Sequence, residues 1–266
     1  MSKADRLEVF VVTKGHAFQR DPYEAMLRAI GIEPTFVDQP AAAALLNPDA
    51  LRRYDALLFY DMPGLDFRAP IGERPAPLAP DSAMVRGFEA LLAEGKGIVA
   101  MHHALAGWPG WPGYAEALGG AFLYRDGIVR GVPAPSSGYA GDVRYTVRVV
   151  DAGHPVAAGL PERFELFDEL YWHEVFNDAV TPLIVRETQV PAERFTSAMR
   201  AVRRLGLGDG EPWAPSPGSS TLGWTKQAGN SLLVYLQPGD GPETYADPFY
   251  RQLLGNALRW VAGRGV

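Results

Sequence analysis

Residues 97–102, Gly-Ile-Val-Ala-Met-His, decide the fold, because a nearly pure apolar run ends directly on an imidazole. Runs of this kind recur upstream and alternate with segments of helical pattern. Strands that are apolar throughout and alternate with helices are typical of a parallel sheet covered on both faces. The expected strands are 7–13, 34–37, 55–60 and 97–101, and the expected helices are 23–30, 41–54 with a break at Asn47-Pro48, and 81–94.

The second half of the chain is less regular. Its patterns predict further strands at 144–150 and 183–187, a hairpin of 222–226 with 231–237, and a last helix over 247–262 that opens on Asp-Pro. Residues 203–220, rich in glycine and proline, are expected to form a flexible loop. We find no internal repeat or linker, so we expect a single domain over 1–266.

Composition narrows the function classes. The chain has 266 residues, 47% hydrophobic residues, a net charge of −6 and no cysteine. Thiolate catalysis, disulfides and cysteine metal sites are therefore excluded. A nucleic-acid partner is not expected without a basic face, and no apolar run approaches the ~20 residues of a membrane span. The N-terminus lacks a signal-peptide pattern, so the expected location is the cytoplasm. The sequence leaves self-association open.

Ligands of parallel sheets bind at the carboxyl ends of the strands, which directs attention to three of the five histidines. His16 and His102 come directly after predicted strand ends, and His103 follows His102. Asp61 stands at the end of the third strand. Imidazoles here could act as acid, base or metal ligand, or could be held structurally by hydrogen bonds.

The densest polar constellation is 167–174, Phe-Asp-Glu-Leu-Tyr-Trp-His-Glu. Asp168 and Glu169 lie among apolar residues, where carboxylates titrate high and can act as general acids. With His16 or His102 they could also bind a divalent ion. The alternative is the capped start of a helix with a salt-bridged face.

Aromatic residues gather in predicted loops and at element ends, and could stack on a sugar ring or simply pack in the core. They are Trp108, Trp111, Tyr114, Trp224 and Tyr245.

Several short motifs, in order and spacing, resemble the ThuA-like (trehalose-utilisation) proteins along most of the chain. They are Gly15-His16, the run 97–102 leading to Trp108, Tyr114 and Leu118-Gly119-Gly120, His154-Pro155-Val156 before Gly159-Leu160-Pro161, Asp168-Glu169-Leu170-Tyr171, Gly223-Trp224, and the closing helix 249–260.

The resemblance implies an α/β fold of the class I glutamine amidotransferase type: a flavodoxin-like three-layer sandwich with a mainly parallel central sheet, with extra strands and loops in the second half. In those enzymes a cysteine occupies the sharp turn after a strand. Here His102 stands at the comparable strand end, so the chain is not expected to be a cysteine-dependent amidotransferase. The family usually carries Gly-His after its penultimate strand, whereas this chain has Gly239-Asp240. Asp240 could still coordinate a metal or accept a proton.

The leading hypothesis is a sugar-processing protein that converts a disaccharide or its keto derivative, with a small-molecule sugar as its partner. His102 and Glu169 are the expected acid/base pair. The alternatives are a non-catalytic carbohydrate-binding or regulatory domain and a metal-dependent hydrolase. The further residue roles that we predict are: catalytic, Asp168, His16 and Tyr171; substrate-binding, His103, Trp108, Trp224, Asp240 and Asp61; and ligands of a divalent ion such as zinc, His16, His102 and His173.

Overall fold

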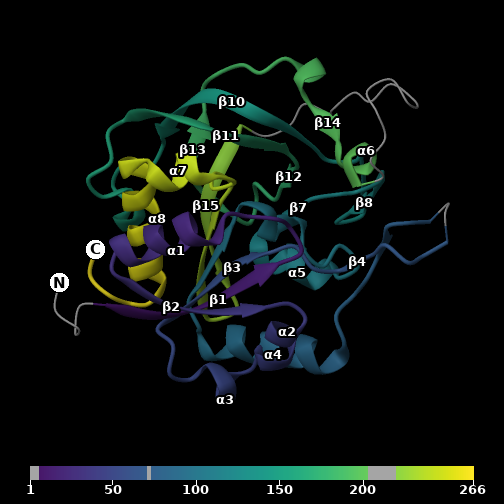
Figure 1. The fold of residues 1–266 in the computed structure, drawn as a ribbon, viewed down its shortest axis with the longest axis horizontal. Helices are drawn as coiled ribbons and strands as arrows, with labels where there is room; N and C mark the ends of the chain where they lie inside the picture. The colour runs from purple at the N-terminus through teal and green to yellow at the C-terminus, as the bar shows by residue number, and fades with distance from the viewer. Residues whose placement is uncertain (1–5, 71–72, 203–219) are drawn as a thin grey trace.

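A ten-stranded sheet crosses the whole molecule (Figure 1). We describe the fold from a computed structural model, which covers residues 6–70, 73–202 and 220–266. The strand order is β11-β10-β13-β15-β16-β6-β3-β1-β2, and β14 pairs with β10. The sheet is therefore parallel from β16 to β2 and antiparallel from β11 to β15.

The parallel half follows the predicted apolar runs closely. Its inner strands are fully or largely buried because helices cover both faces, whereas the edge strand 32–38 is mostly half-buried. The strands are β1 (Leu7–Lys14), β2 (Ile32–Asp38), β3 (Ala56–Asp61), β6 (Ile98–Met101) and β16 (Ser231–Leu236).

Alternate side chains of β1 enter two different cores, as the two-residue period of a strand requires. Val9 and Val11 pack in the core under α1, α7 and α8, whereas Phe10 and Val12 pack under the helices of the other face. The first layer holds α1 (Arg20–Ala29), α7 (Pro242–Ala246) and α8 (Pro248–Val261). The other layer holds α2 (Ala41–Leu45), α3 (Pro48–Leu51), α4 (Ser82–Glu94) and α5 (Pro112–Leu118). The three-layer sandwich is confirmed (Figure 1).

Polar caps set the ends of the two longest helices. The Asp81 carboxylate accepts the N–H of Met84 at the start of α4, and Gly95 ends that helix with a φ of 80°. The Asp247 carboxylate accepts the N–H groups of Phe249 and Tyr250 at the start of α8. Both helix starts are where the sequence predicts them.

The antiparallel half rules out the helix-start alternative for residues 167–174. Residues 167–174 do not begin a helix: most of them belong to β11 (Arg163–Trp172), which pairs along β10 (Gly138–Val149) with an irregularity between Ala140 and Val143. The remaining long strands are β13 (Thr181–Arg186) and β15 (Thr221–Ala228). Side chains of β11 alternate between core and surface, so Asp168 points inward and Glu165 outward.

Short elements complete the described chain. They are β4 (Leu65–Asp66), β5 (Ala76–Pro77), β7 (Gly120–Ala121), β8 (Gly127–Val129), β9 (Val132–Ala134), β12 (Glu174–Val175), β14 (Thr196–Ser197), α6 (Ala198–Val202), and the 3-10 turns η2 (His102–Ala106), η3 (Pro155–Ala157) and η4 (Ala192–Arg194). Nearly all of the loop predicted at 203–220 lies outside the described residues. Within them, no helix combines the length and apolarity that a membrane span requires.

Candidate functional site

The candidate site lies where the carboxyl ends of the parallel strands meet β11. The loops after β1, β6 and β16 carry His16, the pair His102-His103, and Asp240, and β11 carries Asp168, Glu169 and Tyr171. Two glycines allow the close approach of these loops. A Cβ on Gly15 would lie 2.3 Å from the Met62 carbonyl oxygen, and one on Gly239 would lie 2.4 Å from the Tyr250 hydroxyl.

His102 occupies the sharp turn after β6 with a φ of 49°, a left-handed conformation that few non-glycine residues adopt. Its ring is fully buried and stacks on the Tyr171 ring at 4.5 Å. Nδ1 lies 2.6 Å from the main-chain oxygen of Gln237. A carbonyl oxygen only accepts hydrogen bonds, so Nδ1 must carry a proton and Nε2 is the atom available for chemistry.

Nε2 of His102 faces two carboxylates. It lies 3.2 Å from Oε2 of Glu169 and 3.4 Å from Oδ1 of Asp240. Burial acts to lower the pKa of His102, but the hydrogen bonds and charges of Asp240 and Glu169 outweigh it and raise the pKa to about 10. Burial opposes ionisation of Asp240, yet the hydrogen bond to His102 lowers the pKa of this carboxyl below its ordinary value. The imidazole is therefore a cation held between two acids.

Asp168 anchors the turn that carries Asp240. Its carboxylate accepts the Gly239 N–H at 2.6 Å and the Asp240 N–H at 3.1 Å. Burial raises the pKa of Asp168 to about 6, against the nearby charge of His102 and the two backbone hydrogen bonds, which lower it. Asp168 has its acceptors engaged by the main chain, so its evident work is to position Asp240.

His103 points away from His102 into a second group. Its Nε2 lies 3.0 Å from the main-chain oxygen of Tyr60, and its ring lies 4.7 Å from that of His16. Burial, followed by the charges of His102 and His16, lowers the pKa of His103 well below its usual range. His103 is therefore neutral, in contrast to its neighbour in the sequence.

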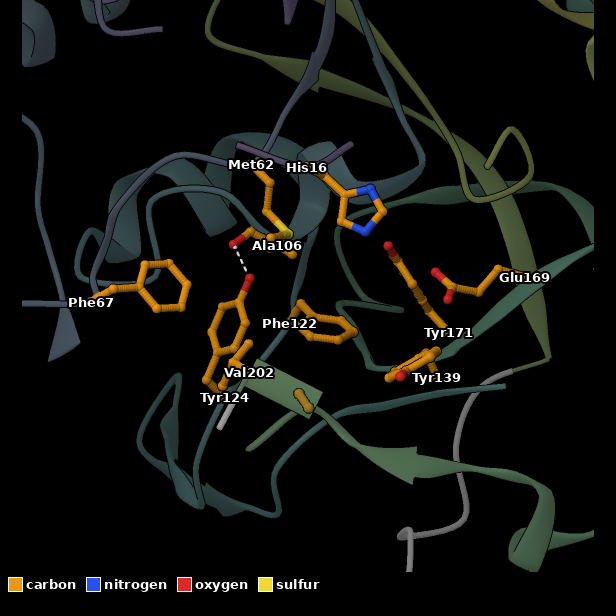
Figure 2. Close-up of a pocket in the computed structure, with 11 residues that line it drawn as sticks. His16, Met62, Phe67, Ala106, Phe122, Tyr124, Tyr139, Glu169, Tyr171 and Val202 are labelled. Atoms are coloured by element: carbon orange, nitrogen blue, oxygen red, sulfur yellow. Dashed lines mark hydrogen bonds between the residues drawn. The ribbon is translucent and has the colours of Figure 1, made fainter. Parts of the chain in front are cut away.

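A cavity of about 410 Å³ opens beside Glu169 (Figure 2). Aromatic rings form much of its wall, with His16 and Glu169 at one side. The Glu169 side chain is 15% exposed and that of Asp240 is 37% exposed, whereas His102 is covered. The cavity wall comprises His16, Met62, Phe67, Ala106, Phe122, Tyr124, Tyr139, Glu169, Tyr171, Ala198 and Val202.

This arrangement can support two kinds of chemistry. A protonated imidazole beside an accessible carboxylate can give one proton and take another. Two overlapping groups, His102 with Glu169 and Asp240, and His16 with His103 and Asp240, also bring their ligand atoms within 4.8 Å of one another.

Comparison with known protein families shows to which family the chain belongs. The sequence model of the ThuA family, described as trehalose utilisation, matches residues 8–261. The chain belongs to the ThuA family. No curated protein sequence matches this ThuA chain.

Solved structures agree on the fold. A ThuA-like protein from Parabacteroides merdae superposes with a TM-score of 0.68 at 16% identity, covering 98% of this chain and 92% of that one. A ThuA-like protein from Bacteroides uniformis gives 0.62 at 18% identity, covering 98% and 93%. A glutamine amidotransferase from Thermotoga maritima gives 0.51 at 12% identity, covering 97% and 98%. The amidotransferase-like scaffold that the sequence predicts is confirmed.

The ThuA structure brings together most of the predicted site residues but not all. His16, His102, His103, Asp168, Glu169, Tyr171 and Asp240 converge at the sheet edge. His173 belongs to neither group of candidate metal ligands; it is buried against Trp224, and burial lowers its pKa to about 4.

Three other predicted residues lie outside the cavity wall. Trp224 is 0% exposed and donates its indole N–H to the Leu118 main-chain oxygen, so its ring is not open to a sugar. Asp61 is buried and accepts a hydrogen bond from Gln39 at 2.7 Å. Trp108 lines a separate cavity of about 110 Å³.

Sequence reasoning missed residues that hold or line the ThuA site. Gln237 fixes the tautomer of His102 through its main-chain oxygen and donates its side-chain amide to the Glu169 main-chain oxygen. Tyr139 contributes to the cavity wall from β10. Gln237 could have been found, since it directly follows an apolar strand run. No local pattern marks Tyr139, because its position depends on the register of β10 against β11.

Proposed function

We propose that this ThuA protein cleaves a keto-glycoside by acid/base elimination, with Glu169 as the base and His102 as the acid. One observation carries the proposal: an imidazolium Nε2 lies 3.2 Å from a carboxylate that borders a cavity of about 410 Å³. Nδ1 of His102 donates its proton to the Gln237 main-chain oxygen, so the proton on Nε2 is the one that can be transferred.

The cavity supports a small-molecule substrate. Its size falls in the usual range for ligand pockets, and apolar and aromatic walls with a few polar groups are their usual lining. Tyr124 and Phe122 offer ring surfaces that suit the apolar face of a sugar. The family description, trehalose utilisation, points to a disaccharide.

The proposed reaction uses a keto group one carbon away from the glycosidic carbon. That ketone acidifies the C–H bond on the intervening carbon, and the Glu169 carboxylate takes the proton. The C–H electron pair forms a carbon–carbon double bond while the glycosidic C–O bond breaks. The departing oxygen receives the Nε2 proton of His102. The products are an unsaturated keto-sugar and the second sugar, which leaves with a free hydroxyl group in place of the glycosidic bond.

The same geometry returns the pair to its starting state. After elimination Glu169 holds a proton and His102 is neutral. Oε2 of Glu169 and Nε2 of His102 are 3.2 Å apart, so the proton can pass directly from the carboxyl to the imidazole. The Asp240 carboxylate beside Nε2 favours the charged imidazolium that results.

The test is turnover of keto-trehalose and other keto-disaccharides by the purified protein, with and without added zinc. Glu169→Gln and His102→Gln are expected to lower kcat by about 10²- to 10⁴-fold each. Glu165→Gln is the matched control, since this glutamate is exposed on the same strand. Absence of turnover with every keto-disaccharide would refute the proposal.

The same variants discriminate a sugar-binding domain from an enzyme. A binding domain would hold the disaccharide equally well after His102→Gln, and wild-type protein would return the sugar unchanged. In deuterated water, an enzyme following the proposed route incorporates deuterium at the acidified carbon of recovered substrate whenever proton removal is reversible.

A further inference from the structure

His103 has an unused ring nitrogen buried beside His16 and Asp240. Its Nε2 lies 3.0 Å from the main-chain oxygen of Tyr60, which can only accept. Nε2 must therefore carry the hydrogen of this neutral ring, and Nδ1 holds a lone pair. Nδ1 is buried and has no hydrogen-bond partner among the described residues.

An unsatisfied buried acceptor costs about 1–3 kcal/mol, so its position calls for an explanation. A histidine that ligates a metal typically donates its other ring N–H to a main-chain carbonyl or a carboxylate, which sets the tautomer and aims the ligand nitrogen. His103 shows this arrangement with the Tyr60 carbonyl. The surroundings of the ring are thus those of a ligand rather than those of a proton donor.

Two further donors, from His16 and Asp240, lie beside the His103 ring. Ligand atoms of His16, His103 and Asp240 lie within 4.8 Å of one another. Each comes from a different loop: those after β1, β6 and β16. His16 is exposed, so its ring can turn to tighten the group, while His103 is held by ring contacts with Tyr60 at 4.2 Å.

The neighbouring group is a poorer metal site. Both nitrogens of His102 already have partners, and a metal on Nε2 would have to displace the proton that faces Glu169 and Asp240. Asp240 borders both groups. A carboxylate has two oxygens, so it can face His102 with Oδ1 and offer its other oxygen to an ion.

We propose that His16, His103 and Asp240 bind a divalent transition metal ion, with zinc as the best fit. Two imidazoles and one carboxylate match the donors that zinc accepts, and three protein ligands leave a fourth position open for water or a substrate oxygen. This site is distinct from the proton-transfer pair, and its existence does not depend on the elimination chemistry proposed above.

Direct binding tests the site without reference to activity. The full chain, stripped with a chelator, is titrated with zinc chloride by calorimetry and with cobalt chloride by visible absorption. We expect one ion per chain. His16→Ala should weaken binding at least about 10- to 100-fold, since losing even a supporting group costs a metal site that much. His16 is exposed, so this variant should fold normally.

Two variants serve as matched controls. Glu169→Gln, in the neighbouring group, and His154→Ala, which removes an imidazole at η3, should both keep wild-type affinity. A ¹H–¹⁵N spectrum of the imidazoles gives a second readout: zinc should shift Nδ1 of His103 and leave His173 unchanged.

The following results would overturn the assignment: no saturable binding at up to about 100 μM zinc, loss of binding in Glu169→Gln with retention in His16→Ala, or zinc shifts confined to other histidines. Because binding and turnover are measured separately, failure of the metal site and failure of the elimination proposal can be told apart.

Discussion

The parallel and antiparallel halves of the sheet bring different chemistry to the same edge. Loops of the parallel half carry the imidazoles His16, His102 and His103, whereas β11 of the antiparallel half carries the acids Asp168 and Glu169. The parallel half by itself pairs His102 with Asp240, and β11 adds Glu169, the carboxylate that borders the cavity. The site therefore forms only where the carboxyl ends of the parallel strands meet β11 of the antiparallel half.

The two halves also bury a carboxylate in different ways. Asp168 on β11 receives two N–H groups from the turn after β16. Asp61 at the end of β3 receives one hydrogen bond from Gln39, and its Oδ1 is buried with no partner among the described residues. Burial raises the pKa of Asp61 to about 7, although the hydrogen bonds act to lower it. Asp168 therefore holds the turn that carries Asp240, whereas the ionised carboxyl of Asp61 destabilises the folded state of the parallel half.

Asp61→Asn should produce the largest change. The pKa of Asp61 rises from 3.8 to about 7 on folding, so only the folded state keeps its proton between these values. Stability therefore falls as the pH rises through this window, by an amount on the order of 4 kcal/mol. Over urea unfolding from pH 4 to pH 7, stability should decline more steeply in wild-type protein than in Asp61→Asn, because the raised pKa of Asp168 contributes to the slope of both proteins. The exposed Asp142→Asn serves as control, and equal slopes in all three proteins would contradict the prediction.

Asp168→Ala should weaken the contact between β11 and the turn after β16. It leaves the buried N–H of Gly239 and the partly buried N–H of Asp240 without an acceptor, which we expect to cost about 2–4 kcal/mol of unfolding free energy. Turnover should also fall, because Asp240 loses its anchor. Glu165→Ala, exposed on the same strand, should change stability by no more than about 0.5 kcal/mol. Equal stability of the two variants in urea would show that the two hydrogen bonds of Asp168 do not stabilise the folded protein.

Trp224→Phe separates core packing from sugar binding. The indole N–H of this fully buried ring donates to the Leu118 main-chain oxygen at 2.8 Å, so the variant should lose about 1–3 kcal/mol of stability. Affinity for a disaccharide should stay at the wild-type level, whereas Tyr139→Ala, at the cavity wall, should weaken it. Calorimetric titration decides this, and the reverse pattern would return Trp224 to the substrate-binding residues.

His16→Ala should have the smallest effect on the metal-free protein, within about 0.5 kcal/mol, because the side chain is exposed. Added zinc should enlarge the difference in stability between wild-type protein and His16→Ala. At about a hundredfold excess over Kd, a bound ion should stabilise wild-type protein by roughly 2.7 kcal/mol and the variant by far less. Thermal unfolding with and without zinc measures both. An equal rise in Tm for the two proteins would show that His16 takes no part in binding.

Local sequence patterns were enough to predict the parallel half. An apolar strand, a capping aspartate and a terminal glycine each act over a few residues, so β1, β3, β6, α4 and α8 were found close to their observed bounds. The antiparallel half was harder. Only 144–150 of β10 was predicted, because Gly138, Gly141 and the irregularity after Ala140 interrupt the alternation. Residues 167–174 carry a pattern that suits a helix start as well as the strand observed.

The sequence by itself determined the fold class and the edge of the sheet where His16 and His102 would lie, because strand direction alone decides where the loops of a parallel sheet gather. Only the tertiary structure decided which nitrogen of each imidazole is free. That choice depends on carbonyl groups far along the chain, such as the Gln237 oxygen 135 positions from His102. The tertiary structure also decided that Asp168 accepts hydrogen bonds from the turn at Gly239 and that Trp224 is buried, since hydrogen-bond partners and burial arise from packing between distant segments.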